Sequence, residues 1–321
     1  MYNDKRILIV DGLNLFMRHY IAHPAMSDNG EQIGGFVGFF NNLVRLIEKC
    51  KPKKIYVIWE GGGSKRKRDL YADYKMKRRP QKLNRYYDDI PDTYKNRNYQ
   101  ISLLIKFLEI FPIVQIYIED AEADDVIGYL CKYKFKNKNK IIISSDHDYY
   151  QLIDKDVLIW SPTIKSFVDS KKVIERYGIH PNNFCLAKSI VGDKSDNIPG
   201  VNRVGYRTLV KKYPILSDNV QYFIQDIIDL SKKMINEGKA TKAINEIYNS
   251  KKLIERNYKL VLLDMNNLAH FQLEKINQNI ENLKLSWKNM NAHKHLNELG
   301  IKSIDLLNCG QIFKQLKKDI N

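Results

Sequence analysis

The sequence lacks closely spaced cysteines and long apolar runs. Its four cysteines, Cys50, Cys131, Cys185 and Cys309, form no C-x-x-C pair, which argues against a zinc ribbon or a disulfide framework and predicts buried thiols. No segment approaches the roughly 18 to 20 apolar residues needed to span a bilayer. The first residues lead directly into the apolar run 7–10, unlike a secretory signal. We therefore expect a cytoplasmic protein without a membrane partner.

Acidic residues are the minority charge. The 321 residues include 53 Lys and Arg against 37 Asp and Glu, a net charge of +16. This excess predicts an anionic partner, nucleic acid before any other. The carboxylates nevertheless gather where apolar runs end: at Asp11, at Glu122, Asp124 and Asp125, at Asp146 and Asp148, and at Asp193 and Asp196. Such crowding requires a cation to offset the repulsion.

Apolar runs typical of strands alternate with helical spacing over about the first 160 residues. The predicted strands are 7–10, 55–59, 114–118, 141–143 and 157–160, and the predicted helices are 34–50, 99–110 and 123–133. This alternation favours an α/β fold, in which helices cover both faces of a mostly parallel, twisted sheet. Such sheets bind ligands outside the carboxyl ends of their strands, where Asp11, Glu60, Glu122 and Asp146 are expected.

The acidic clusters together predict a divalent metal site. Mg²⁺ and Mn²⁺ prefer oxygen ligands, whereas zinc favours Cys and His. Each cluster alone also fits a structural role, since Asp-Gly is a common turn and Glu-Ala-Asp-Asp suits a helix start. Their joint placement at strand ends of a basic protein favours metal binding.

A basic and aromatic segment follows the second predicted strand. It carries Lys65, Arg66, Lys67, Arg68, Lys75, Arg78, Arg79 and Lys82, interleaved with Tyr71, Tyr74, Tyr86 and Tyr87. This composition is typical of segments that follow phosphates and stack bases. A solvated charged loop is the alternative interpretation.

Taken in chain order, these motifs resemble those of the flap endonuclease family of 5′-nucleases, especially stand-alone bacteriophage 5′-3′ exonucleases such as phage ribonuclease H. The matching segments are 10–14, 74–75, 122–125, 145–148 with 151–152, and 192–200. The resemblance implies a PIN-like (Rossmann-like) nuclease domain over residues 1–170, with a helical arch at about 61–98. A helical DNA-binding region over 171–321 would follow, with a helix-hairpin-helix at about 185–212.

The resemblance also implies roles for individual residues. Two Mg²⁺ or Mn²⁺ ions would be held by Asp11, Glu122, Asp124, Asp125, Asp146, Asp148, Asp193 and Asp196. Glu60 stands where the family has Asp, and its longer side chain would reach a metal-bound water. Lys75 would contact the scissile phosphate and stabilise developing charge, and Arg18 would bind a phosphate. The basic residues from Lys65 to Lys82, with Tyr74, would contact DNA in the arch.

The segment 198–209 resembles the family's helix-hairpin-helix turn. Gly200, Gly205, Arg207 and Thr208 would hold duplex phosphates there, with a K⁺ ion in the turn. Arg203 replaces the first glycine of the usual Gly-hydrophobic-Gly. A left-handed backbone is costly for Arg, which weakens the expectation of a potassium site and leaves Arg203 to meet a phosphate directly.

The implied activity is that of a 5′-3′ exonuclease and flap endonuclease that leaves 5′-phosphates. Its substrates would be branched or 5′-tailed duplex DNA and RNA/DNA hybrids, cut by a monomer during replication. Two alternatives remain: a PIN-type ribonuclease, and a catalytically weak junction-binding protein in which Glu60 impairs metal capture. The end of the chain, 311–318, fits an amphipathic core helix better than a docking motif for a sliding clamp or single-strand binding protein.

Overall fold

One six-stranded sheet organises the first half of the chain. A computed structural model describes residues 6–76, 94–281 and 289–320. The strand order is β3-β2-β1-β4-β5-β6, and every neighbouring pair is parallel except β5 and β6. The strands are β1 (Ile7–Asp11), β2 (Lys54–Trp59), β3 (Val114–Tyr117), β4 (Lys140–Ile143), β5 (Val157–Ser161) and β6 (Ser166–Val168). The mostly parallel sheet is confirmed, and β6 is a short antiparallel addition that the sequence pattern did not reveal.

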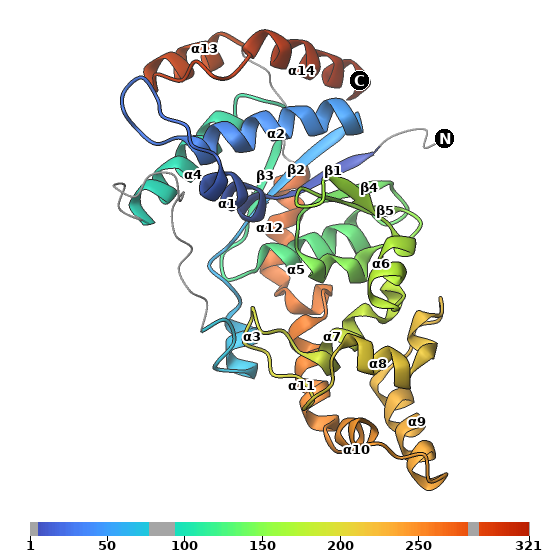
Figure 1. Ribbon diagram of the computed structural model, residues 1–321. Coiled ribbons are helices and arrows are strands. Elements are labelled where there is room, and N and C mark those ends of the chain that lie inside the picture. The colour runs from blue at the N-terminus through green and yellow to red at the C-terminus, as the bar shows by residue number, and fades with distance from the viewer. Residues whose placement is uncertain (1–5, 77–93, 282–288, 321) are drawn as a thin grey trace.

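Helices cover both faces of this sheet (Figure 1) because side chains alternate along each buried strand. Leu8 and Val10 of β1 join one apolar cluster, with residues of α1 (Gly12–Ala22), α2 (Gly34–Cys50) and α4 (Tyr94–Leu108). Ile7 and Ile9 join the other, with residues of α5 (Ala123–Tyr129) and the π-helix η1 (Leu130–Lys134). The single helix predicted over 123–133 is therefore divided into two helical types.

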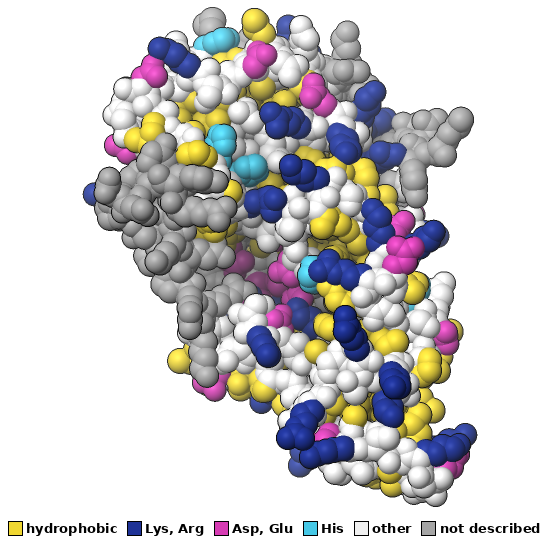
Figure 2. Space-filling model, in the orientation of Figure 1, with side chains coloured by type: hydrophobic (Ala, Val, Ile, Leu, Met, Phe, Trp, Pro, Cys, Tyr) yellow, Lys and Arg dark blue, Asp and Glu magenta, His cyan; other side chains and the backbone are white. Residues whose placement is uncertain are grey.

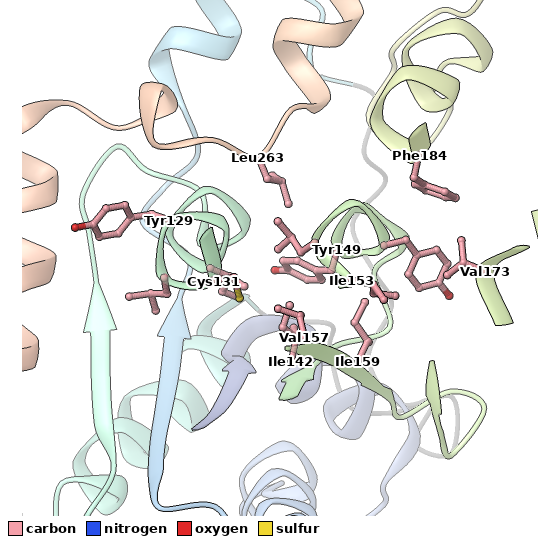
Figure 3. Close-up of a cluster of buried hydrophobic side chains, with 14 of the residues drawn as sticks. Tyr129, Cys131, Ile142, Tyr149, Ile153, Val157, Ile159, Val173, Phe184 and Leu263 are labelled. Carbon is pink, nitrogen blue, oxygen red and sulfur yellow. The ribbon is translucent and has the colours of Figure 1, made fainter. Parts of the chain in front are cut away.

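A helical half follows the sheet, as predicted. It contains α6 (Ser170–Tyr177), α7 (Phe184–Val191), α8 (Tyr206–Lys212), α9 (Ile224–Asn236), α10 (Lys242–Asn249), α11 (Lys251–Val261) and α12 (His270–Glu281). Short 3-10 helices lie at η2 (His147–Leu152), η3 (Pro181–Asn183), η4 (Pro214–Ser217) and η5 (Met265–Asn267). The helix α3 (Lys65–Leu70) follows β2. Figure 3 shows Leu263 of the helical half above Tyr149, and Phe184 on the side of Val173. Both belong to the apolar cluster that also contains Ile142, so one cluster joins the two halves.

The last two helices return to the sheet instead of extending the helical half. In Figure 1, α13 (Asn289–Glu298) and α14 (Leu306–Ile320) lie beside α2. Leu296, Phe313 and Leu316 are buried in the same cluster as the α2 side chains. The DNA-binding region expected over 171–321 stays a prediction, and its last two helices pack on the nuclease half. The core-helix interpretation of 311–318 agrees with the burial of Phe313 and Leu316, whereas Ile312 is half-buried.

All four cysteines are buried and unpaired. Among the residues that the structure describes, no helix combines the length and the apolar character needed to cross a membrane.

Candidate metal and nucleic-acid site

Asp11 is the last residue of β1 and caps the N-terminus of α1. Its Oδ1 accepts a hydrogen bond from the Asn14 backbone at 3.1 Å, and its Oδ2 accepts from Tyr149 Oη at 3.0 Å and Ser144 Oγ at 3.2 Å. Burial, and to a lesser degree the charge of Asp146, raises the pKa of Asp11 to about 6 despite the bond from Asn14. Because burial disfavours the charged form of this carboxyl group, a nearby cation would stabilise it.

Asp11 gives a testable pH dependence. The pKa of Asp11 in the folded protein lies above the ordinary value of 3.8. The stability contributed by its protonated form is therefore present below about pH 4 and is lost as pH rises through about 6. We expect Asp11→Asn to raise the free energy of unfolding in EDTA at pH 7.5 by about 1 to 3 kcal/mol, and much less at pH 4. Urea unfolding at both pH values measures this, with exposed Asp218→Asn as control. An equal gain at both pH values would contradict the prediction.

A first acidic cluster forms where α5 begins. Carboxylate oxygens of Glu122, Asp124 and Asp125 lie within 4.8 Å of one another. Glu60, at the end of β2, accepts from the Ala123 backbone at 3.3 Å. Burial and the charge of Glu122 raise the pKa of Glu60. Glu60 therefore lies beside this cluster, as expected for residues at the carboxyl ends of neighbouring parallel strands. The role of Glu60 as a metal ligand stays a prediction.

Two lysines and a tyrosine contact the first cluster. The Lys67 ammonium lies 2.7 Å from Glu122 Oε2 and 2.9 Å from Asp125 Oδ2. The Lys75 ammonium lies 2.5 Å from Glu122 Oε1, and Tyr74 Oη donates to Glu122 Oε2 at 3.0 Å. Burial alone would raise the pKa of Glu122, but Lys67 and Lys75 outweigh it and lower that pKa to about 2. Burial would lower the pKa of Lys67, and the surrounding carboxylates hold it well above its usual value.

These contacts correct two predicted DNA contacts. Lys67 is 1% exposed and Tyr74 is 4% exposed, so neither is available to track a phosphate or stack a base. Their neighbours Lys65, Arg66 and Arg68 are exposed, as the predicted DNA contact requires. Predicted contacts at Arg78, Arg79 and Lys82 lie outside the described residues.

A second acidic cluster joins the sheet to the helical half. Asp148 comes from η2, while Asp193 and Asp196 follow α7, and their carboxylate oxygens also lie within 4.8 Å of one another. Buried Lys188 pairs with Asp148 and lies 2.7 Å from Asp193 Oδ2. Burial opposes ionisation of Asp193, but Lys188 prevails and lowers the pKa of Asp193 to about 2. The role of Lys188 was not predicted from the sequence, although a lone lysine in the apolar stretch 184–191 was the available signal.

Lys75 links the two clusters. Its backbone N–H donates to the Asp196 carbonyl at 2.9 Å, and its ammonium lies 3.9 Å from Asp196 Oδ2. Asn197 Nδ2 also donates to the Asp73 carbonyl at 2.8 Å. Lys75 has φ of 59°, a left-handed conformation that is uncommon for a residue with a side chain. The surrounding contacts hold this conformation and direct Lys75 between the clusters.

Asp146 and Arg18 lie on the rim outside the two carboxylate groups. Asp146 is partly exposed and accepts a hydrogen bond from the Asp148 backbone at 2.9 Å. Arg18 donates to Thr163 Oγ1 at 3.0 Å, and Thr163 donates to Ser145 Oγ at 2.8 Å. Figure 2 shows acidic side chains in a hollow of this face, with Lys and Arg side chains around it. Asp11 interacts electrostatically with Asp146 and Glu60, and Lys75 contacts both Glu122 and Asp196, so the four sequence clusters converge on one region.

The predicted hairpin lies between α7 and α8. Arg203 has φ of 60° and is exposed, so it adopts the left-handed conformation that glycine would have taken. Gly200 packs against the backbone, because an added Cβ would lie 1.9 Å from the Val191 carbonyl oxygen. Gly205 precedes α8 with open space around it, and Arg207 is exposed. The role of the turn in binding duplex DNA, including the roles of Gly200 and Thr208, stays a prediction.

The donor set suits hard divalent cations. The two groups identified among the described residues consist entirely of carboxylates: Glu122, Asp124 and Asp125, and Asp148, Asp193 and Asp196. Oxygen ligands of this kind suit Mg²⁺, Mn²⁺ and Ca²⁺. The raised pKa of buried Asp11, together with the crowding of like charges, supplies the electrostatic reason for a cation.

The sequence of this chain is similar to those of known exonucleases and DNA polymerases. The family described as "5'-3' exonuclease, N-terminal resolvase-like domain" matches residues 6–178. A 5′-3′ exonuclease of Aquifex aeolicus is 31% identical over 318 residues, 97% of each chain. DNA polymerase I of Caldicellulosiruptor bescii is 30% identical over 247 residues, which cover 71% of this chain and 28% of the polymerase.

Solved structures show the same fold. A complex of the bacteriophage T5 flap endonuclease with DNA and metal ions has a TM-score of 0.66 at 19% identity, over 92% of this chain and 99% of that one. The T5 5′-exonuclease with bound zinc has a TM-score of 0.65 at 22% identity, over 87% and 99%. The matched sequence and the convergent acidic rim lead to one conclusion: the chain belongs to the 5′-3′ exonuclease family.

Proposed function

We propose that this chain is a divalent-metal-dependent 5′-nuclease, acting as both 5′-3′ exonuclease and flap endonuclease. Its substrates are 5′ flaps and RNA primers on duplex DNA, and its products carry 5′-phosphates. Its action belongs to DNA replication in the cytoplasm, in the manner of a stand-alone phage enzyme. The observation that carries the proposal is the convergence of two carboxylate groups with Lys75 between them.

The protein's own groups support this chemistry. Bound Mg²⁺ or Mn²⁺ would supply an activated water and neutralise charge on the phosphodiester. The candidate ligands are the carboxylates of the rim: Asp11, Glu122, Asp124, Asp125, Asp146, Asp148, Asp193 and Asp196, with Glu60 as a further candidate. The Lys75 ammonium contacts Glu122 and Asp196, and it would stabilise negative charge that develops on the scissile phosphate.

The surrounding surface suits an anionic, branched substrate. Lys65, Arg66 and Arg68 are exposed next to the first acidic cluster, while Arg203 and Arg207 are exposed on the helical half. With a net charge of +16, such a surface attracts the phosphate backbone. We assign the first group to the single-stranded 5′ end and the second to the duplex, with a K⁺ ion in the hairpin as a further proposal.

A cleavage panel tests the proposed function. We expect labelled 5′-flap DNA, nicked duplex and RNA-primed duplex to be cut in Mg²⁺ or Mn²⁺, with 5′-phosphate products, and to be bound without cleavage in Ca²⁺. Single-stranded RNA serves as the comparison substrate. Cleavage of that RNA in preference to every duplex substrate would support a PIN-type ribonuclease instead. Tight flap binding in Mg²⁺ without product would support a junction-binding protein in which Glu60 weakens metal capture.

A further inference from the structure

One lysine in a run of four basic residues points into the protein. Lys65, Arg66 and Arg68 are exposed, whereas Lys67 is 1% exposed. Ser64 caps α3 by accepting a hydrogen bond from the Lys67 backbone at 3.2 Å. This cap fixes the direction in which α3 begins, and helical geometry then directs the Lys67 side chain to the first acidic cluster.

The contacts of the three carboxylates with Lys67 are unequal. Its ammonium lies 2.7 Å from Glu122 and 2.9 Å from Asp125, but 3.9 Å from Asp124. The contact with Asp125 is electrostatic, since Asp125 Oδ2 accepts no hydrogen bond among the described residues. A buried ammonium requires such close pairing, because taking it out of water is costly.

Two of the three carboxylates already have partners at both oxygens. Glu122 Oε2 accepts from Lys67 and Tyr74, and Glu122 Oε1 accepts from Lys75. Asp125 Oδ1 accepts from Asn267 at 2.6 Å, opposite the Lys67 contact at Oδ2. Asp124 Oδ1 accepts from the Asp125 backbone at 2.8 Å. Asp124 is therefore the least compensated carboxylate of the cluster.

We propose that Lys67 is a positioning residue, an internal counter-ion that holds Glu122 and Asp125 in place and leaves Asp124 as the open ligand of the first cluster. This proposal rests on the proposed metal-dependent function. The Lys67 ammonium supplies positive charge at the cluster before any divalent ion binds. The stability of the folded protein therefore depends less on bound metal. Without that ammonium, a divalent ion becomes the main source of compensation for Glu122 and Asp125 and binds more tightly.

The test uses Ca²⁺ and thermal unfolding, without any cleavage. We expect Lys67→Met to lower the Tm in EDTA, and Ca²⁺ to raise the Tm of this variant more than that of the wild type. Calorimetric titration should show at least about tenfold tighter Ca²⁺ binding, because a like charge a few ångströms away has been removed. Lys65→Met, on the exposed face of the same helix, is the matched control and should respond as the wild type does.

Two further variants keep the test decisive if Lys67→Met folds poorly. Lys67→Arg should recover most of the stability in EDTA, because its charge is retained. The double variant Lys67→Met with Asp125→Asn should be more stable in EDTA than Lys67→Met alone, because an uncompensated carboxylate has been removed. The proposal is overturned if Ca²⁺ affects Lys67→Met no more than the wild type, or if the double variant is no more stable than the single one.

These results are separable from the outcome of the cleavage panel. Wild-type protein that cuts none of the duplex substrates would refute the nuclease proposal, and the enhanced Ca²⁺ dependence of Lys67→Met would still support the counter-ion. Cleavage in Mg²⁺ together with an unchanged Ca²⁺ response would refute the counter-ion alone.

Discussion

Asp124→Asn is expected to reduce cleavage of a 5′-flap substrate in Mg²⁺ by at least about 10² to 10³-fold, the loss typical of removing one preorganised electrostatic group. Burial raises the pKa of Asp124 well above its usual value, with Glu122 and Asp125 adding to it against the effect of Lys67. Its 3.9 Å separation from Lys67 leaves it less compensated than its neighbours. An Asn side chain keeps the size of Asp but loses the charge that attracts a cation.

Single-turnover cleavage measures this loss, and flap binding in Ca²⁺ shows whether the variant still captures its substrate. Glu119→Gln is the matched control, since it makes the same carboxylate-to-amide change at an exposed position in the segment preceding the cluster. We expect the control to cleave at the wild-type rate. A fully active Asp124→Asn variant would remove this residue from the metal site and weaken the proposed mechanism.

Phe313→Ala is expected to lower the free energy of unfolding by about 3 to 5 kcal/mol, the usual effect of truncating a buried phenylalanine. The Phe313 side chain is 0% exposed, and its ring centroid lies 4.7 Å from that of Phe111. Removing the ring opens a cavity between α14 and the helices that cover one face of the sheet. Urea unfolding of the full chain measures the change.

Leu307→Ala provides the control within the same helix. Leu307 is 75% exposed, so its truncation should change stability by no more than about 0.5 kcal/mol. If Phe313→Ala and Leu307→Ala unfold at the same urea concentration as the wild type, α14 is not part of the core. Such a result would return segment 311–318 to consideration as a docking motif.

The sequence predicted the sheet and its acidic rim because both depend on local patterns. Each strand was visible as a short apolar run, and the carboxyl ends of parallel strands meet at one edge. This rule predicts that Asp11 and Glu60 lie on the same rim. The helix predicted over 34–50 agrees with α2 (Gly34–Cys50), because its apolar residues repeat with helical spacing and Pro52 follows its end.

Other features were not predictable because they depend on packing between distant segments. Four consecutive basic residues look alike in sequence. The Ser64 cap of α3 and the carboxylates at the start of α5 together direct Lys67 inward. Lys188 similarly acquires its role from Asp148, which lies 40 positions earlier. The apolar face of α14 was visible, but its spacing does not reveal the surface that it covers.

The return of α13 and α14 also bears on how the chain is made. Phe40 and Phe313 are buried in one cluster, although a ribosome would synthesise them at widely separated times. The α2 face of the nuclease half therefore stays partly uncovered until residues 289–316 have emerged. Non-local closure of this kind slows folding, and apolar surface exposed meanwhile favours aggregation. The half of the protein that is translated first is thus completed last.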